Sequence, residues 1–259
     1  MDNVEIPGLT GKGERVMSIM AHPDDAEIFC AGTLIRLQEK GFEAHIVSMT
    51  PGDCGSAEIS ASEIAEVRRK EGAQAAAKIR ASYSCLDYRD LRIHYEPKTL
   101  ESVVEMIRRV DPSIVFTHPP RDYMADHEQT SLLVRAACFA APAPNYDTQR
   151  RPAQPPTQHI PHLYYSSPAS GTDIFGKPAE LSVLIDVTDV MGLKTDMLAC
   201  HESQREWLRR QHGMDEYLDE MKRWGAELGK RASVEYAEGF TQHVGHPYPG
   251  EDRLAELLD

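Results

Sequence analysis

The 259-residue chain lacks the features that mark several classes of protein. Its five cysteines lie far apart and form no C-x-x-C pair, which argues against a disulfide framework and a cysteine-based zinc knuckle. No apolar run approaches the ~18 residues that span a bilayer. The start, MDNVEIPGLTGKGE, has acids and glycines where a signal peptide needs a basic and then an apolar stretch. These absences predict a soluble protein of the reducing cytoplasm.

An excess of basic residues is also missing. The chain has 28 Lys and Arg against 41 Asp and Glu, a formal net charge of −13. It therefore lacks the basic face that neutralises nucleic-acid phosphates, and an anionic membrane would repel it. Hydrophobic residues make up 41% and charged residues 27%, which is ordinary for a globular protein and excludes wholesale disorder. We expect no nucleic-acid partner and no membrane partner.

Short apolar runs alternate with longer helical segments, a pattern that predicts βαβ units. We predict strands at 15–20, 44–50, 113–117, 163–167 and 181–187, and helices at 28–40, 61–80, 100–110 and 126–141. The fold class is α/β, a Rossmann-like three-layer sandwich in which helices cover both faces of a mostly parallel sheet. We expect a single domain over residues 1–259, with its functional loops at the carboxyl ends of the strands.

Two further segments depart from this alternation. Residues 141–161 form a Pro-rich loop that is long for a plain connector, which favours a functional role such as bordering a cleft. Residues 190–231 are charged and rich in helix formers. Within them, Trp207 and Trp224 are best explained as packing anchors in the fold or at a subunit interface.

The sequence AHPDDAE, at residues 21–27, directly follows the first predicted strand and opens the first helix. Its imidazole and neighbouring carboxylates, from His22, Asp24 and Asp25, can supply two ligands to a divalent metal and leave one carboxylate free. The alternative is a solvated acidic turn in which an aspartate caps the helix.

The sequence THPPRDYMADH, at residues 117–127, repeats this arrangement after another predicted strand. A sheet brings two such loops together at one edge, so His22, Asp25 and His127 can form a His-Asp-His set. Three protein ligands plus water is the open arrangement of a catalytic zinc rather than a closed structural site.

With these two motifs the chain resembles the LmbE-like, or PIG-L, zinc-dependent de-N-acetylases, which remove acetyl groups from N-acetylglucosamine derivatives and related amides. The resemblance covers roughly residues 15–240. Its further parts are TPGD at 50–53, VRRKE at 67–71, HESQ at 201–204 and YAEGF at 236–240.

The resemblance implies that His22, Asp25 and His127 bind one zinc per chain, or another divalent metal, and that Asp24 is the general base that deprotonates the metal-bound water. The implied activity is hydrolysis of an N-acetyl or other N-acyl group on an amino-sugar-like or other small-molecule amide. The metal would also polarise the amide carbonyl. Members of the family suggest a homo-oligomer, often a hexamer.

Met124 departs from the family pattern, which commonly reads His-Pro-Asp-His where this chain has residues 124–127 as Met-Ala-Asp-His. That first histidine is assigned to proton transfer or to the oxyanion, and methionine serves neither role. Either another group takes its place, or the rate or substrate is altered. We expect Tyr123, which matches the family pattern, to donate a hydrogen bond to the oxyanion, and His118 to protonate the amine.

Arg68, Arg121 and Asp53 are the candidate substrate contacts. Arg68 and Glu71 share one helix face, which by itself predicts a surface ion pair, whereas the resemblance places the matching arginine near the sugar pocket. Asp53 lies in a turn, where it either serves the turn or contacts substrate. We expect Arg121 and Asp122 at the pocket rim.

Two residues have open alternatives. Asp126 either orients the neighbouring ligand His127 or caps the helix that follows. His201 is better explained as a satisfied or solvated histidine than as a catalytic one.

Three rival functions remain. One is an amidase for a non-acetyl amide, another is a metal-binding relative with weak or altered deacetylase activity, and the third is a nucleotide-binding module. The last is disfavoured because no G-x-G-x-x-G follows the first strand, where acidic residues would repel a pyrophosphate.

Overall fold

Seven strands form the centre of the structure, a computed structural model that describes residues 13–212 and 217–258. They are β1 (Arg15–Met20), β2 (Glu43–Ser48), β3 (Ser82–Cys85), β4 (Ile114–Thr117), β5 (His162–Ser166), β6 (Val183–Asp186) and β7 (Ala237–Gln242). In the described residues they make one sheet in the order β3-β2-β1-β4-β5-β7-β6. The strands from β3 to β5 in this order pair in parallel, and β7 is antiparallel to both of its neighbours.

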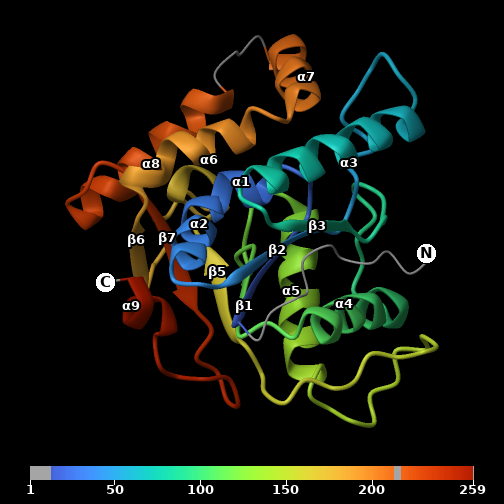
Figure 1. The fold of residues 1–259 in the computed structure, drawn as a ribbon. Coiled ribbons are helices and arrows are strands. Elements are labelled where there is room, and N and C mark those ends of the chain that lie inside the picture. The colour runs from blue at the N-terminus through green and yellow to red at the C-terminus, as the bar shows by residue number, and fades with distance from the viewer. Residues whose placement is uncertain (1–12, 213–216, 259) are drawn as a thin grey trace.

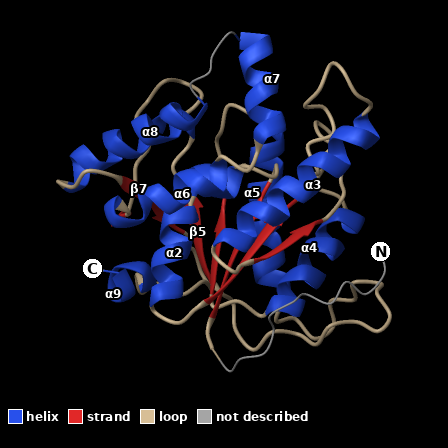
Figure 2. Cartoon of the chain, turned by 45° about the horizontal axis from the view of Figure 1, so that its top comes forward, coloured by secondary structure: helices blue, strands red, loops and turns tan. Residues whose placement is uncertain are grey.

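Helices cover both faces of this sheet (Figure 2). They are α1 (Asp25–Phe29), α2 (Ala31–Glu39), α3 (Ala61–Lys78), α4 (Pro97–Val110), α5 (Ala125–Ala140), α6 (Met191–Leu198), α7 (Glu202–His212), α8 (Tyr217–Ala232) and α9 (Arg253–Leu258). Short 3₁₀ turns occur at η1 (Ala169–Gly171) and η2 (Thr188–Val190). No described helix is long and apolar enough to cross a membrane.

Alternating side chains along the central strands build two separate cores. Val16 and Met20 of β1 pack with α2, α6 and α9 on one face, whereas Met17 and Ile19 pack with α4 and α5 on the other. Because side chains of a strand alternate between the two faces, a strand buried on both sides needs apolar residues throughout. The predicted three-layer α/β fold is confirmed.

The strands at 15–20 and 113–117 and the helix at 61–80 are confirmed to within about two residues at either end, the usual uncertainty of element boundaries. β3, β7 and α9 were not predicted. The strand β7 escaped notice because its sequence, AEGFTQ, is not continuously apolar although most of it is buried. Residues 213–216, part of the helix-rich stretch predicted at 190–231, lie outside the described residues. So do residues 1–12, on which the expectation that there is no signal peptide depends.

The Pro-rich loop packs against α4 rather than along the main cavity of the described structure. Arg108 of α4 donates hydrogen bonds to the carbonyl oxygens of Ala141, Ala143 and Tyr146, at 2.9, 2.7 and 3.0 Å. In Figure 1 the loop lies at the bottom of the view, and α3, α7 and α8 lie across the top. These hydrogen bonds therefore tie the loop to the carboxyl-terminal turn of α4.

The acidic residue Glu238 is buried in β7, and its carboxylate has partners there. Its carboxylate accepts hydrogen bonds from the backbone N–H groups of Gly32 and Thr33, at 2.8 and 2.7 Å, and pairs with Lys194 of α6 at 2.6 Å. The two N–H groups belong to the first turn of α2, where they have no partner within the helix. A side chain at Gly32 would approach Val187 to 2.6 Å, so glycine is required there.

We expect Glu238→Gln to lower the free energy of unfolding by about 3 kcal/mol, because it leaves the Lys194 ammonium buried without a counter-charge. Urea denaturation followed by circular dichroism measures this loss. Glu227→Gln is the matched control, since it removes an exposed pair with Lys230 that is worth below about 1 kcal/mol. Equal unfolding midpoints for the two variants would contradict the structural role given to Glu238.

Candidate metal centre and its pocket

The loops that follow β1 and β4 meet at one edge of the sheet, because these two strands are parallel neighbours. The chain leaves β1 toward β2 on one side, and β4 lies on the other side, so the strand order reverses between β1 and β4. Ligand sites in open α/β sheets lie outside the carboxyl ends of strands at such a reversal. Both motifs singled out in the sequence, 21–27 and 117–127, are in these two loops.

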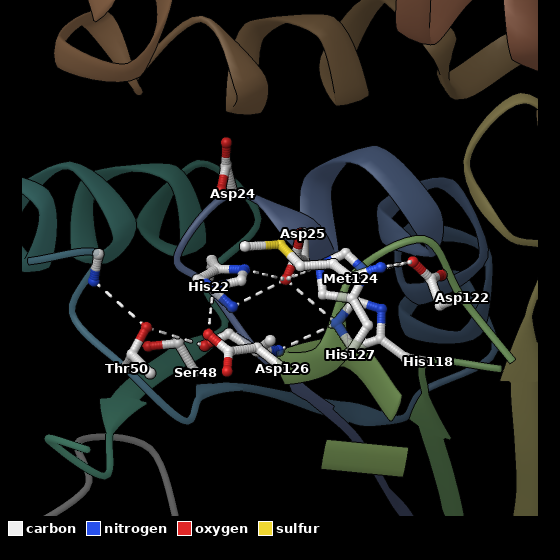
Figure 3. A network of polar contacts seen from close by, with 12 residues as sticks. His22, Asp24, Asp25, Ser48, Thr50, His118, Asp122, Met124, Asp126 and His127 are labelled. Carbon is white, nitrogen blue, oxygen red and sulfur yellow. Dashed lines mark hydrogen bonds and ion pairs between the residues drawn. The ribbon is translucent and has the colours of Figure 1, made fainter. Parts of the chain in front are cut away.

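His22, Asp25 and His127 converge within this edge (Figure 3). One ligand atom from each lies within 4.8 Å of the other two. The Asp25 Oδ2 atom is 3.3 Å from His22 Nδ1 and 3.6 Å from His127 Nε2. All three side chains are buried, and His127 Nε2 has no hydrogen-bond partner among the described residues. A buried, unpaired imidazole nitrogen aimed at a carboxylate fits a metal site.

Each imidazole is held through its other nitrogen by a separate carboxylate. His22 Nε2 lies 3.3 Å from Asp126 Oδ2, and His127 Nδ1 lies 3.0 Å from Asp122 Oδ1. Asp126 is fixed in turn by the backbone N–H of Leu91, at 2.7 Å. This leaves His22 Nδ1 and His127 Nε2 directed at Asp25, the arrangement in which carboxylates orient metal-binding histidines.

These contacts correct two sequence expectations. Asp126 contacts His22, from the other loop, and not its neighbour His127. Asp122 is 3% exposed and contacts His127, so it is not at the pocket rim. Sequence reasoning placed them otherwise because the direction of a loop side chain does not follow from its position in the motif.

The carboxylates of the cluster stabilise positive charge on the groups that they surround. Burial lowers the pKa of His22, but hydrogen bonds with Asp126 and Asp25 more than offset this effect and raise the pKa to about 10. Burial raises the pKa of Asp25, but the charge of His127 and the contact with His118, whose Nε2 lies 3.1 Å from Asp25 Oδ2, more than offset it and hold that pKa well below its usual range. Ionised carboxylates around buried imidazoles are chemically suited to a divalent cation.

Asp24 turns away from this cluster, as Figure 3 shows. Its Oδ1 accepts a hydrogen bond from the Arg68 guanidinium at 3.2 Å, and its Oδ2 accepts a short one from the Tyr217 hydroxyl. Arg68 also lies against Gly52, whose φ of +74° suits glycine and whose position leaves no room for a side chain beside the guanidinium. The two adjacent aspartates thus have separate environments.

Tyr217 is a site residue that sequence reasoning missed. It is the first residue of α8 and belongs to none of the motifs that carry the resemblance. Burial and the charge of Asp24 raise its pKa well above the usual value, so the phenol stays protonated and donates to Asp24. No local signal identified it, because its partner lies 193 positions away in the sequence.

A cavity of about 620 Å³ lies over the site. Its floor includes His22, Asp24, Asp25, Arg68 and His127. Trp207 and Leu208 of α7 and Met221 and Trp224 of α8 provide apolar side chains on the facing wall. The two tryptophans therefore line this pocket, a position the sequence did not predict for them.

Tyr123 and Met124 line the same cavity. Tyr123 is 71% exposed and its ring meets the His127 ring edge-on at 5.4 Å. The thioether of Met124 lies across the ligand set (Figure 3). Both residues therefore face the space in which a substrate would lie.

His118, Arg121 and Asp53 do not line the main cavity among the described residues. His118 is fully buried, and its Nε2 accepts the backbone N–H of Ala21 at 3.0 Å. Burial and the charge of His127 lower its pKa to about 4. Arg121 is exposed, and Asp53 holds the Arg89 side chain at 2.8 Å.

The helix face that carries Arg68 and Glu71 is buried, so these two residues do not form a surface ion pair. Glu71 accepts hydrogen bonds from the backbone N–H and hydroxyl of Ser203, at 2.9 and 2.6 Å, which ties α7 to α3. His201 is also fully buried, with its Nε2 3.6 Å from Glu27. The 201–204 segment thus positions the α7 wall over the site.

The chain is similar to known proteins both in sequence and in fold. A sequence model of the PIG-L family, described as GlcNAc-PI de-N-acetylase, matches residues 17–138. Diacetylchitobiose deacetylase of Thermococcus kodakarensis is 28% identical over 200 residues, 74% of this chain and 70% of that protein. The uncharacterised deacetylase YaiS of Escherichia coli is 30% identical over 139 residues, 51% of this chain and 71% of YaiS. A 4-carboxy-2-hydroxymuconate hydratase from Pseudomonas putida has the same fold, with a TM-score of 0.74 at 22% identity over 92% of this chain and 99% of that one.

We expect Asp122→Asn and Asp126→Asn each to weaken binding of a divalent metal by about 10- to 100-fold, because each removes a carboxylate that orients a histidine. Competition with a chromophoric chelator measures the affinity. Asp87→Asn, which changes only an exposed pair with Arg69, is the matched control. Unchanged affinity in both site variants would refute the metal-binding interpretation of the cluster.

Proposed function

The chain belongs to the PIG-L family of de-N-acetylases, and from this premise we propose that it is a metal-dependent hydrolase of small-molecule amides. Its proposed reaction removes an N-acetyl or other N-acyl group from an amino-sugar-like compound or a related amide. The observation that carries this proposal is the convergence of His22, Asp25 and His127 beneath a cavity that also contains the separate carboxylate of Asp24.

We assign the metal to His22 Nδ1, His127 Nε2 and a carboxylate oxygen of Asp25. Two imidazoles and one carboxylate suit zinc and also other divalent ions, and we propose one ion per chain. When bound, the ion would supply Lewis acidity that polarises an amide carbonyl and lowers the pKa of water toward ~7. The unpaired His127 Nε2 supports this assignment.

Asp24 is the proposed general base. It lines the cavity beside the ligand set, but it is oriented by Arg68 and Tyr217 and not by the ligand histidines. These two donors hold the carboxylate in a fixed orientation, and one of its lone pairs can take a proton from the attacking water. A base held in this way contributes through position as well as through proton affinity.

Collapse of the tetrahedral intermediate requires a proton on the departing amine. Met124 cannot provide it, and His118 lies outside the cavity lining. We therefore assign this step to Asp24, which carries the proton taken from water and can return it to the nitrogen. Tyr123 is the proposed hydrogen-bond donor to the oxyanion, since it lines the cavity and its ring lies against His127.

The carboxylates in the pocket favour a neutral amide over a substrate with several carboxylates. The name of the relative 4-carboxy-2-hydroxymuconate hydratase indicates a substrate of the second kind. A substrate with several carboxylates would meet Asp24 and Asp90, which are not proposed metal ligands. The two arginines of the described lining face carboxylates of the protein, Arg68 facing Asp24 and Arg223 facing Glu220 at 2.8 Å. Like charges at this range repel, so a neutral amide fits this pocket better.

Asp24→Asn is expected to lower kcat for acetate release from an N-acetylglucosamine derivative by about 10²- to 10⁴-fold, because an amide cannot accept the proton. Metal content, measured by elemental analysis, should stay at the wild-type level, since Asp24 is not a proposed ligand. Asp90→Asn in the same cavity serves as the control for a change of charge alone. Wild-type activity in Asp24→Asn would overturn the proposed mechanism.

Met124→His is expected to raise kcat for an N-acetyl substrate by about tenfold or more, because it adds a proton donor on the cavity wall next to the ligand set. Met124→Ala opens the same space without adding a donor and should not show this gain. Steady-state rates at matched metal content compare the two variants. A histidine variant no faster than the alanine variant would show that the methionine does not limit proton transfer.

A further inference from the structure

A second cavity, of about 450 Å³, adjoins the pocket over the metal centre. The two cavities share four lining residues, Ile28 and Phe29 of the α1 segment and Met221 and Trp224 of α8. All four side chains are apolar or aromatic, so a molecule that passes from one cavity to the other meets no charged side chain at that boundary. The helix α8 contributes residues to both cavities.

Polar groups lie on both sides of the first cavity, around the ligand set and, as Gln204, Glu220 and Arg223, on α7 and α8. On the same two helices, Trp207, Leu208 and Met221 add apolar surface. A ligand that fits both parts has a polar portion beside the metal centre and an apolar portion beneath α7 and α8.

The second cavity continues the apolar portion. Pro168, Thr172, Leu228 and two glycines, Gly171 and Gly225, are among its lining residues. Small residues leave space without adding polar groups.

Four of the charged groups in this lining are paired, whereas Arg231 lies at its exposed side without a salt-bridge partner among the described residues. Lys194 is bound to Glu238 at 2.6 Å, and Lys230 to Glu227 at 2.5 Å. These charges are therefore matched within the protein, and a substrate need not compensate them.

We propose that the natural substrate is an amphiphilic amide, whose polar head lies at the metal centre and whose apolar chain or ring system passes Trp224 into the second cavity. The inference rests on the proposed hydrolase function and names its substrate class. It makes α8 the element that selects substrates. Transfer of apolar carbon from water into such a cavity favours binding in proportion to the area buried.

Two substrate series test this inference on the metal-loaded protein. In one, N-acylglucosamines carry acyl chains from acetyl to decanoyl; in the other, N-acetylglucosamine carries alkyl glycosides from methyl to decyl. We expect kcat/KM to rise about threefold with each added methylene in one of the series, the series whose chain enters the second cavity. The arm that shows the rise identifies the side of the amide that carries the apolar group.

Thr172→Phe is the diagnostic variant, because this residue lines the second cavity and not the first. The larger side chain should fill the space and bring the decanoyl-to-acetyl or decyl-to-methyl ratio of kcat/KM close to one. Lys177→Phe is the matched control, on an exposed position of the same loop outside both cavities. It should retain the wild-type ratio.

Intrinsic fluorescence gives a second readout that does not depend on turnover. The chain has two tryptophans, and both line the pocket over the metal centre, so ligand titrated into Asp24→Asn should change their emission. The long-chain ligand should bind more tightly than its short-chain counterpart, and Thr172→Phe should remove that difference.

The outcomes separate this inference from the proposed function. Flat rates in both series, with acetate release that still depends on Asp24, would overturn the amphiphilic substrate and leave the hydrolase in place. Absence of hydrolysis of every amide by the metal-loaded protein would overturn both.

Discussion

Parallel pairing of β1 with β4 is the constraint on which the candidate site depends. It ends two strands at the same edge and brings His22 and Asp25 from one loop against His127 from the other. The two loops then hold each other, since His22 is oriented by Asp126 of the second loop. A change in the position of either strand would therefore alter the metal ligands, their supporting carboxylates and the cavity together. The double burial of the central strands keeps this pairing rigid, because each face of β1 belongs to a separate core.

The adjacent residues Asp24 and Asp25 have different contacts because the backbone directs their side chains to opposite sides. The Asp25 carboxylate turns inward, where it accepts the backbone N–H of His22 at 2.7 Å and faces the imidazoles. Asp24 faces Arg68 and Tyr217 at the cavity wall. Two carboxylates on one ion would repel each other, whereas this separation leaves one for the metal and the other for proton transfer. Of the many acids behind the strongly negative net charge of the chain, these two are central to the proposed mechanism.

The carboxyl-terminal helices convert an exposed edge of the sheet into an enclosed site. Ser203 ties α7 to Glu71 of α3, and Tyr217 ties α8 to Asp24. These contacts place an apolar wall opposite a floor of charged residues, an arrangement in which a few polar groups orient a ligand and apolar surface supplies affinity. Helix α8 also lines the second cavity. The proposed catalytic site and the proposed selection of substrates therefore both depend on this one helix. The charge pair of Lys194 and Glu238 lies beneath it and fixes α6 and α2 to β7.

The sequence by itself determined the α/β class and most central elements, and it predicted the three residues His22, Asp25 and His127 that the structure brings together. Local periodicity specifies strands such as 15–20, and the two His-Asp motifs mark the loops that follow them. The strand β7 could not be identified in this way, because Glu238 is buried by a charge partner far away in the sequence and not by an apolar pattern. Only the tertiary structure decided that Asp126 supports His22, that Tyr217 binds Asp24 and that both tryptophans line the pocket. The physical reason is that side-chain direction and long-range contacts depend on how elements pack, whereas a local pattern encodes only which face of its own element a residue occupies.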